Sequence, residues 1–391
     1  MRGRKFFKPL LRFLNDLHSR HEHPNRSLHF DQYLILLLLA YFNPAIRSLR
    51  GMIDVSGSEL GERNFGLHRT SLGSLSEASH VFDPEPLRRI FLELAADAHA
   101  VDAPKLRNFP QGLELLAVDA SLWKLLPRMA RTFYQGKLTR AGKGALKAHV
   151  VFSVLDAAPK DVAFTDGTVD ERRVLPKLIH PGAMHVFDRG YWSQALFKLL
   201  LDAGASFVTR VRSNVELTTL EERPVSEAAA KAGVCSDRLV KLNDGALNGR
   251  ALRVVTVRRI VPASRNLHAK CKRGKHAAYD GEAREQEWVL ITDRLDLDAE
   301  LIVAIYASRW QIEVFFRWFK VVLQCKHLFS ESENGMELQF YTALIASVLV
   351  VIHTQRKPTK MLLLALQMYL SGWHDWAHVE EKIAQCKKVG P

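Results

Sequence analysis

Apolar residues change their spacing along the chain near residue 110. Before that point they recur every three to four residues, as at Phe6, Leu10, Leu14 and Leu17, which predicts helices. Further helices are expected at about 32–41 and 87–98, and no strand pattern interrupts them. We therefore expect residues 1–105 to form a helical N-terminal region.

Short apolar runs typical of strands follow from residue 110 onward. They alternate with helical patterns near 171–179 and 192–201, which gives the order β-β-β-α-β-α-β. The strands are expected at Leu113–Asp119, Ala145–Leu155, Asp161–Thr165, Ala183–Asp188 and Ser206–Val211. This order predicts an α/β fold in which helices pack on a central sheet.

Residues 210–294 interrupt the alternation of strands and helices. Strand patterns at about 239–242, 251–261 and 287–291 are separated by turn signals such as Asn248-Gly249. A crossover needs only about a dozen residues, so this stretch is expected to be a β-rich insertion. A long helix at 297–324 and an apolar helix at 336–353 return to the core. The core is therefore expected at 106–209 and 295–355, and a helical C-terminal tail at 356–391.

Composition and charge indicate which kind of molecule the protein binds. The 391 residues include 55 Lys and Arg against 42 Asp and Glu, a net charge of +13, which favours an anionic partner such as nucleic acid or an acidic membrane. The apolar runs at 33–42 and 343–352 are about half the ~20 residues of a bilayer-spanning helix, so no membrane is expected. The four cysteines are too far apart for a compact zinc motif and indicate a reduced, cytoplasmic chain.

Two carboxylates end apolar runs of the expected sheet. Asp119 follows Leu115–Val118, and Asp188 follows His185–Phe187. The edge of a sheet beyond its strands is where α/β proteins gather ligand sites, although a single Asp there is often a turn or cap residue. The sequence has no G-x-S-x-G and no H-E-x-x-H, and its one glycine-rich stretch misses the P-loop spacing.

The expected helix at 297–324 carries a polar stripe. Tyr306, Arg309, Glu313 and Lys320 fall within an arc of roughly 60° at 100° per residue. An ion-paired surface would give the same pattern. A Glu flanked by two cations and a Tyr also suits an anionic substrate held beside a metal-binding carboxylate.

These residues together resemble the Y-R-E-K signature of the insertion sequence 4 family of bacterial DDE transposases. The stripe Tyr306-x2-Arg309-x3-Glu313-x6-Lys320 matches that signature without departure. Val118-Asp119-Ala120-Ser121 is similar to the motif of the family's first Asp, and the stretch from Val186 to Tyr191 to that of its second. The resemblance covers about residues 110–355.

The resemblance implies an RNase H-like core in which Asp119, Asp188 and Glu313 are the catalytic metal ligands. Phosphodiester cleavage and strand transfer by two Mg²⁺ ions, with Mn²⁺ as a substitute, need such oxygen ligands. It also implies that Tyr306, Arg309 and Lys320 contact DNA near the cleaved end. The partners would be the inverted-repeat ends of the element and a target DNA, bound by a homodimer in the bacterial cytoplasm.

The insertion carries further candidates for DNA contact. Its basic segment contains Lys270, Lys272, Arg273 and Lys275, which would hold phosphates unless the segment is a solvated loop. Trp288 is a candidate for stacking on an extruded base, with core packing as the alternative. Two other functions stay open, a catalytically silent DNA-binding regulator and an RNase H-like nuclease without strand transfer.

Overall fold

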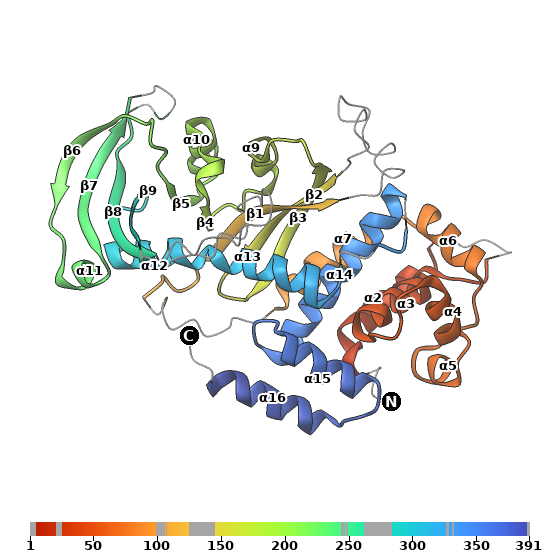
Figure 1. Ribbon diagram of the computed structural model, residues 1–391. Coiled ribbons are helices and arrows are strands. Elements are labelled where there is room, and N and C mark those ends of the chain that lie inside the picture. The colour runs from red at the N-terminus through yellow and green to blue at the C-terminus, as the bar shows by residue number, and fades with distance from the viewer. Residues whose placement is uncertain are drawn as a thin grey trace, which may run out of the picture. The chain divides into compact units, whose positions relative to one another are not determined.

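The computed structural model describes residues 5–20, 26–98, 106, 108–124, 145–243, 247, 249–261, 284–325, 328–330 and 332–388. The chain divides into two compact units. Unit 1 comprises Met1–Asp102, Asp119–Asp170 and Trp310–Pro391, and unit 2 comprises Ala103–Val118 and Glu171–Arg309. The described part of the chain is a mixed α/β fold with one large sheet and many helices (Figure 1).

The N-terminal part of unit 1 is helical, as the apolar spacing predicts. Serine side chains cap three of its helices: Ser48, Ser58 and Ser71 accept hydrogen bonds from the backbone of the first turn. The elements are η1 (Lys8–Leu10), α2 (Leu11–His18), α3 (Phe30–Phe42), α4 (Leu49–Ser56), α5 (Glu59–Phe65), α6 (Leu72–Val81) and α7 (Glu85–Ala96).

The C-terminal part of unit 1 is organised around α14 (Glu333–Thr354), which packs on α3, α6 and α7. By length and composition this helix could cross a bilayer, but 89% of its most apolar window is buried inside the protein. It is therefore the core helix of unit 1. Helices α15 (Lys360–Leu370) and α16 (Trp376–Lys388) follow and pack on each other (Figure 1).

A nine-stranded sheet has the order β3-β2-β1-β4-β5-β9-β8-β7-β6. Strand β1 crosses from unit 2 to unit 1 at Val118–Asp119. In unit 1, β2 and β3 pair antiparallel, while in unit 2 the first half of β1 pairs parallel with β4, and β4 with β5. The strands of this half are β1 (Leu115–Lys124), β2 (Ala145–Ser153), β3 (Ala158–Asp166), β4 (Met184–Phe187) and β5 (Ser206–Arg210).

Helical segments connect the strands of unit 2 that lie in parallel. Helix α9 (Glu171–Val174) and the 3-10 turn η4 (Leu175–Leu178) precede β4, and the 3-10 turn η5 (Arg189–Tyr191) follows it. Helix α10 (Gln194–Asp202) then packs on β5 and completes a β-α-β crossover.

Residues 210–294 extend the same sheet. Strand β9 (Arg284–Thr292) pairs antiparallel with β5 on one side and with β8 (Leu252–Val261) on the other. Beyond β8 lie β7 (Val234–Leu242) and the edge strand β6 (Leu217–Arg223), and a short helix α11 (Glu227–Lys231) connects these two. The sequence pattern does not predict β6 or α11, because β6 is largely exposed and has no apolar face.

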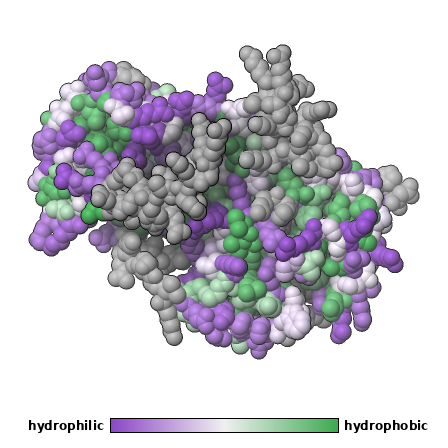
Figure 2. Space-filling model, in the orientation of Figure 1, coloured by the Kyte–Doolittle hydropathy of each residue, from purple (hydrophilic) through white to green (hydrophobic). Residues whose placement is uncertain are grey.

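The exposed edge strand β6 carries charged side chains beside an exposed leucine. Leu220 is 52% exposed, next to Glu221 and Glu222. Figure 2 shows hydrophobic residues scattered among hydrophilic ones in the area at the left where β6–β8 lie. Charged residues on an edge strand oppose pairing with another sheet.

The helix expected at 297–324 is not one uniform α-helix. It consists of α12 (Ala299–Ser308) in unit 2, then α13 (Trp310–Arg317) and the π-helix η7 (Trp318–Val322) in unit 1. In the π-helix the N–H of Leu323 donates to the carbonyl of Trp318, five residues back. Each residue of this π-helix therefore turns through less than 100° about the helix axis. The arc of roughly 60° calculated for the polar stripe assumes an α-helix throughout, so it does not apply to Lys320.

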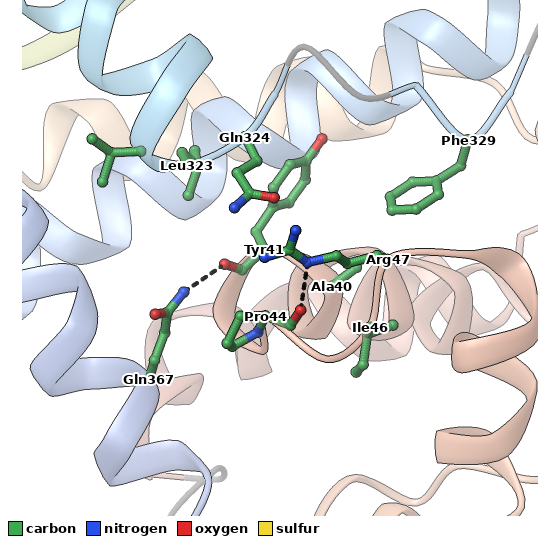
Figure 3. A pocket seen from close by; sticks show the side chains of 10 residues that line it. Ala40, Tyr41, Pro44, Ile46, Arg47, Leu323, Gln324, Phe329 and Gln367 are labelled. Carbon is green, nitrogen blue, oxygen red and sulfur yellow. Dashed lines mark hydrogen bonds between the residues drawn. The ribbon is translucent and has the colours of Figure 1, made fainter.

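A cavity of about 240 Å³ lies in unit 1 where the π-helical segment ends (Figure 3). Tyr41 and Arg47 line it from the end of α3 and the loop that follows, and Gln367 lines it from α15. Gln324, which has a left-handed backbone at φ 62°, borders the same cavity. Gln367 donates to the carbonyl of Tyr41 across the cavity wall, which ties α15 to α3.

Candidate functional site

The two aspartates of the expected site follow the last paired residues of neighbouring strands. In the parallel pairing of β1 and β4, Val118 lies opposite Phe187. Asp119 and Asp188 are the next residues of their chains, so each carboxylate leaves its strand at an equivalent position. Both residues are half-buried. Parallel pairing, which the sequence pattern alone does not fix, is what makes the two positions equivalent.

The turn after β4 holds Asp188 in place. The Asp188 carboxylate caps η5 by accepting the N–H of Gly190 at 2.6 Å. Thr209 on β5 donates its hydroxyl to the carbonyl of Asp188 at 3.1 Å, and Arg212 donates to the carbonyls of Arg189 and Gly190. A Cβ at Gly190 would lie 2.8 Å from the carboxylate oxygen, so a larger residue there would push the carboxylate aside.

Asp119 and Glu313 belong to unit 1. The carboxylate of Asp119 accepts the N–H of Ala120 at 2.8 Å. Glu313 lies half-buried in the first turn of α13, whose residues Ile312 and Phe315 are buried. The ring of Phe315 lies 5.1 Å from that of Phe152 on β2, which seats α13 on the strands of unit 1.

Lys320 lies in the π-helix and points at β1. Its ammonium donates to the hydroxyl of Ser121 and to the carbonyl of Leu122, both at 2.7 Å. It also lies 4.1 Å from the ring centre of Trp123. Burial lowers the pKa of this ammonium. Three successive residues of β1 therefore surround the end of this side chain.

Tyr306 and Trp288 form an aromatic pair within unit 2. Their rings meet edge to face with centres 5.4 Å apart. Arg210 and Arg259 lie over the Trp288 ring at 5.2 and 4.8 Å. Trp288 is half-buried between these neighbours, and its role in base stacking stays a prediction.

The phenol of Tyr306 lies in a charged environment. Burial raises its pKa, while the charges of Arg309 and Arg210 and a hydrogen bond with Arg309 act in the opposite direction. The charge of Asp188 acts in the same direction as burial and raises the pKa further. Tyr306 therefore interacts electrostatically with both Arg309 and Asp188 within unit 2, and the assignment of these residues to one DNA-binding site stays a prediction.

The carboxylates fit a divalent metal by their chemistry, because Mg²⁺ prefers oxygen ligands. Within the described ranges no three His, Cys, Asp or Glu residues form a ready-made metal cluster. Asp119 and Glu313 belong to unit 1, and Asp188 belongs to unit 2. The predicted contacts at Lys270, Lys272, Arg273 and Lys275 lie outside the described residues.

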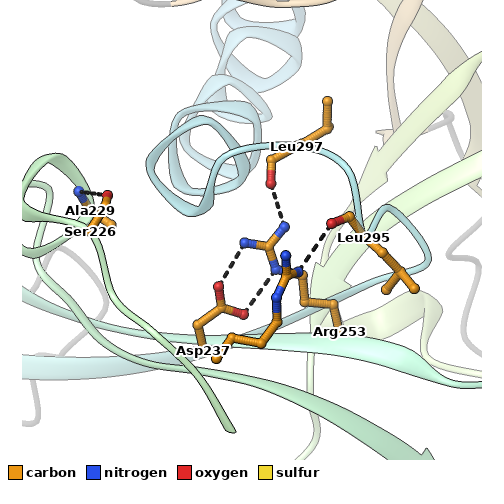
Figure 4. Close-up of polar contacts among 7 residues, drawn as sticks. Ser226, Ala229, Asp237, Arg253, Leu295 and Leu297 are labelled. Atoms are coloured by element: carbon orange, nitrogen blue, oxygen red, sulfur yellow. Dashed lines mark hydrogen bonds and ion pairs between the residues drawn. The ribbon is translucent and has the colours of Figure 1, made fainter. Parts of the chain in front are cut away.

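A buried ion pair that the sequence pattern does not predict joins the insertion to the start of α12. Asp237 on β7 and Arg253 on β8 meet at 2.7 Å, with side chains 4% and 3% exposed. Arg253 also donates to the carbonyl of Leu297 (Figure 4). Arg223 on β6 donates to the carbonyl of Leu295 at 3.1 Å. No local pattern predicts such a pair, because the pairing of β7 with β8 and the burial of both side chains bring the two charges together.

The fold is that of an α/β protein with carboxylates at the ends of neighbouring strands, and comparison with known protein families identifies its class. The family described as "Transposase DDE domain" matches residues 110–349, more than half of the chain. The chain belongs to this family, and the match contains Asp119, Asp188 and Glu313 together with Tyr306, Arg309 and Lys320.

Individual relatives agree with the family match. The chain is 30% identical over 209 residues to the putative transposase y4zB of Sinorhizobium fredii, a match that covers 53% of each chain. The chain thus spans about half the length of this relative. It is 24% identical to the probable transposase for insertion sequence element IS5377 of Geobacillus stearothermophilus, over 75% of this chain and 70% of that one.

Among solved structures, the chain is similar to one described as a piggyBac transposase synaptic complex with hairpin DNA. The identity is 14%, the TM-score is 0.41, and the match covers 98% of this chain and 84% of that one.

Proposed function

We propose that the protein is a transposase of the insertion sequence 4 type, which cleaves DNA at the ends of its element and joins them to a target DNA. The family match over residues 110–349 supports this proposal. The observation that carries it is the parallel register of β1 and β4, in which Asp119 and Asp188 each follow one residue of the pair Val118–Phe187. The order β3-β2-β1-β4-β5 supports an RNase H-like core.

In this proposal Asp119, Asp188 and Glu313 bind the divalent metal through their carboxylate oxygens. When bound, two Mg²⁺ ions activate the attacking oxygen and stabilise the leaving oxygen of the phosphodiester. The backbone N–H of Gly190 holds the Asp188 carboxylate in a fixed orientation at 2.6 Å. Fixed carboxylates reduce the reorganisation that binding a metal requires.

Arg309 is proposed to hold a phosphate of the cleaved end. Its guanidinium carries a fixed positive charge and a planar set of donors suited to phosphate oxygens. The hydrogen bond with the buried phenol of Tyr306 restricts the orientation of the guanidinium. The net charge of +13 supports an extended DNA partner, and the paired ends of one element would be bound by a homodimer.

The test uses purified protein, Mg²⁺ and DNA that carries the inverted repeats flanking the element. We expect cleavage at the ends and joining to a target in wild type. Asp119→Asn, Asp188→Asn and Glu313→Gln should each abolish cleavage while end binding persists, because each change removes a charged ligand at nearly constant shape.

Gel separation of cleaved and joined products checks this prediction. Cleavage near the wild-type rate in one variant would remove that residue from the metal site. Cleavage without joining would favour a nuclease, and end binding by wild type without cleavage would favour a DNA-binding regulator.

A further inference from the structure

Lys320 bridges the two elements of unit 1 that carry proposed metal ligands. Its ammonium donates to Ser121 and Leu122 of β1, at 2.7 Å each. Ser121 lies two residues after Asp119 on this strand. Residues two apart in a strand share one face of the sheet, so Lys320 contacts the face from which the Asp119 side chain also leaves.

Aromatic packing around Trp123 also holds the segment that contains Lys320 against β1. The ring of Trp123, on which the ammonium rests at 4.1 Å, meets Phe316, Phe319 and Phe340 edge to face at 6.4, 6.2 and 4.8 Å. Phe316 follows Glu313 within α13, and Phe319 precedes Lys320 in the π-helix. The part of the segment that follows Glu313, from Phe316 to Lys320, is therefore held against β1.

The π-helix gives Lys320 this direction. Between Trp318 and Val322 the backbone turns less per residue than in an α-helix, as the bond from Leu323 to the carbonyl of Trp318 shows. Insertions of this kind often occur at functional sites. Lys320 consequently faces the strand with two of its three donors in use, an arrangement unlike that of a side chain presented to a phosphate in solvent.

We propose that Lys320 is a positioning residue, which fixes the spacing of the Asp119 and Glu313 carboxylates by joining β1 to the helix of Glu313. This inference rests on the proposed function of those carboxylates as metal ligands. It assigns Lys320 to the support of the metal site, whereas the signature predicts a DNA contact. Residues that orient metal ligands typically change metal affinity about 10–100-fold when removed.

The first measurement is the affinity for Mn²⁺, obtained by calorimetry on the full chain without DNA. Lys320→Met keeps an unbranched side chain one atom shorter than lysine and removes its donors, and we expect Mn²⁺ to bind about tenfold more weakly. Cleavage by this variant should need more Mg²⁺ and recover at saturating Mg²⁺, a rescue that a general folding defect would not show.

The second measurement is binding to the element's end at several salt concentrations. For Lys320→Met we expect the affinity to change less than about twofold and the salt slope to stay as in wild type. A direct phosphate contact predicts the reverse result: unchanged Mn²⁺ affinity, weaker end binding and a slope smaller by about 0.9. That result would overturn the proposal.

Ser121→Ala is the matched variant, because it removes only the hydroxyl that accepts from Lys320 and changes no charge. It should weaken Mn²⁺ binding in the same direction, and the double variant should be no worse than Lys320→Met, since both act through one contact. If Lys320→Met fails to fold, Ser121→Ala decides alone, and wild-type Mn²⁺ affinity in it refutes the proposal. Glu313→Gln separates the two hypotheses, because unchanged Mn²⁺ binding there would refute the metal site itself.

Discussion

At the residue scale, the side chains beside the site are set by backbone contacts as much as by their own charge. Gly190 provides the N–H that orients Asp188, and its lack of a Cβ leaves the room that the carboxylate needs. Thr209 on β5 secures the same turn through the carbonyl of Asp188. A glycine and a neighbouring hydroxyl thus fix the turn that carries one of the three carboxylates proposed to bind metal.

A buried histidine in β4 makes the stability of unit 2 depend on pH. His185 is 0% exposed, and its Nε2 accepts the N–H of His180. Burial, with a smaller contribution from His180, lowers the pKa of His185 from 6.5 to about 4. The unfolded chain therefore binds the proton first, so the folded state loses stability as the pH falls from about 6.5 towards 4.

Replacing His185 with Gln tests this linkage. Wild type should lose about 2 kcal/mol more of its free energy of unfolding than His185→Gln between pH 7.5 and pH 5.0. Urea unfolding at both pH values measures the difference. Equal losses in the two proteins would mean that His185 is protonated in the folded state. His149→Gln makes the same test in unit 1, because burial lowers the pKa of that imidazole to about 4 as well.

At the element scale, a buried ion pair of the insertion anchors the residues just before α12. Arg253 joins β8 to Asp237 of β7 and to the carbonyl of Leu297, two residues before α12. This helix packs on β4, β5, β7 and β8 of unit 2. The insertion therefore contributes to the placement of the helix that bears Tyr306.

Removing one partner of this ion pair should lower the stability of the protein. Arg253→Met leaves Asp237 as an uncompensated buried charge, and we expect the free energy of unfolding to fall by about 3–5 kcal/mol. Adding Asp237→Leu should restore part of the loss, because the stranded charge is then gone. The control is Arg258→Met on the same strand, where the partner Glu285 is exposed and the loss should be below about 1 kcal/mol.

Denaturant unfolding of the three variants measures these differences. A loss in Arg253→Met no larger than that of the control would show that the buried pair contributes little. A double variant less stable than Arg253→Met would show that Asp237 is stabilised by other groups.

At the scale of the whole molecule, the positive charge should govern DNA binding through released counterions. Neutralising Lys270, Lys272, Arg273 and Lys275 together should weaken binding and flatten its dependence on salt, by about 0.9 in slope for each phosphate that these side chains neutralise. The control neutralises four cations that the structure pairs with carboxylates, namely Arg20, Lys198, Lys231 and Lys382. DNA-binding titrations from low to high salt compare the slopes of log affinity against log salt concentration. Equal slopes in both variants would mean that the four cations of the segment do not contact DNA phosphates.

The helical N-terminal region, the apolar core helix and most strands of the sheet can be predicted from the amino-acid sequence. These follow from the spacing of apolar residues, which a segment of about ten residues already displays. The sequence also determines the family, because Asp119, Asp188 and the spacing from Tyr306 to Lys320 are written in the order of the chain.

Three features become visible only in the folded protein: the pairing of β9 with β5, the ion pair of Arg253 with Asp237, and the direction of the Lys320 side chain. Each of these depends on contacts between different strands or helices, and such contacts depend on burial and hydrogen bonding that local patterns do not encode. The π-helix is the sharpest case. A helical wheel assumes about 100° per residue, whereas the backbone from Trp318 to Val322 turns less, so that Lys320 faces β1.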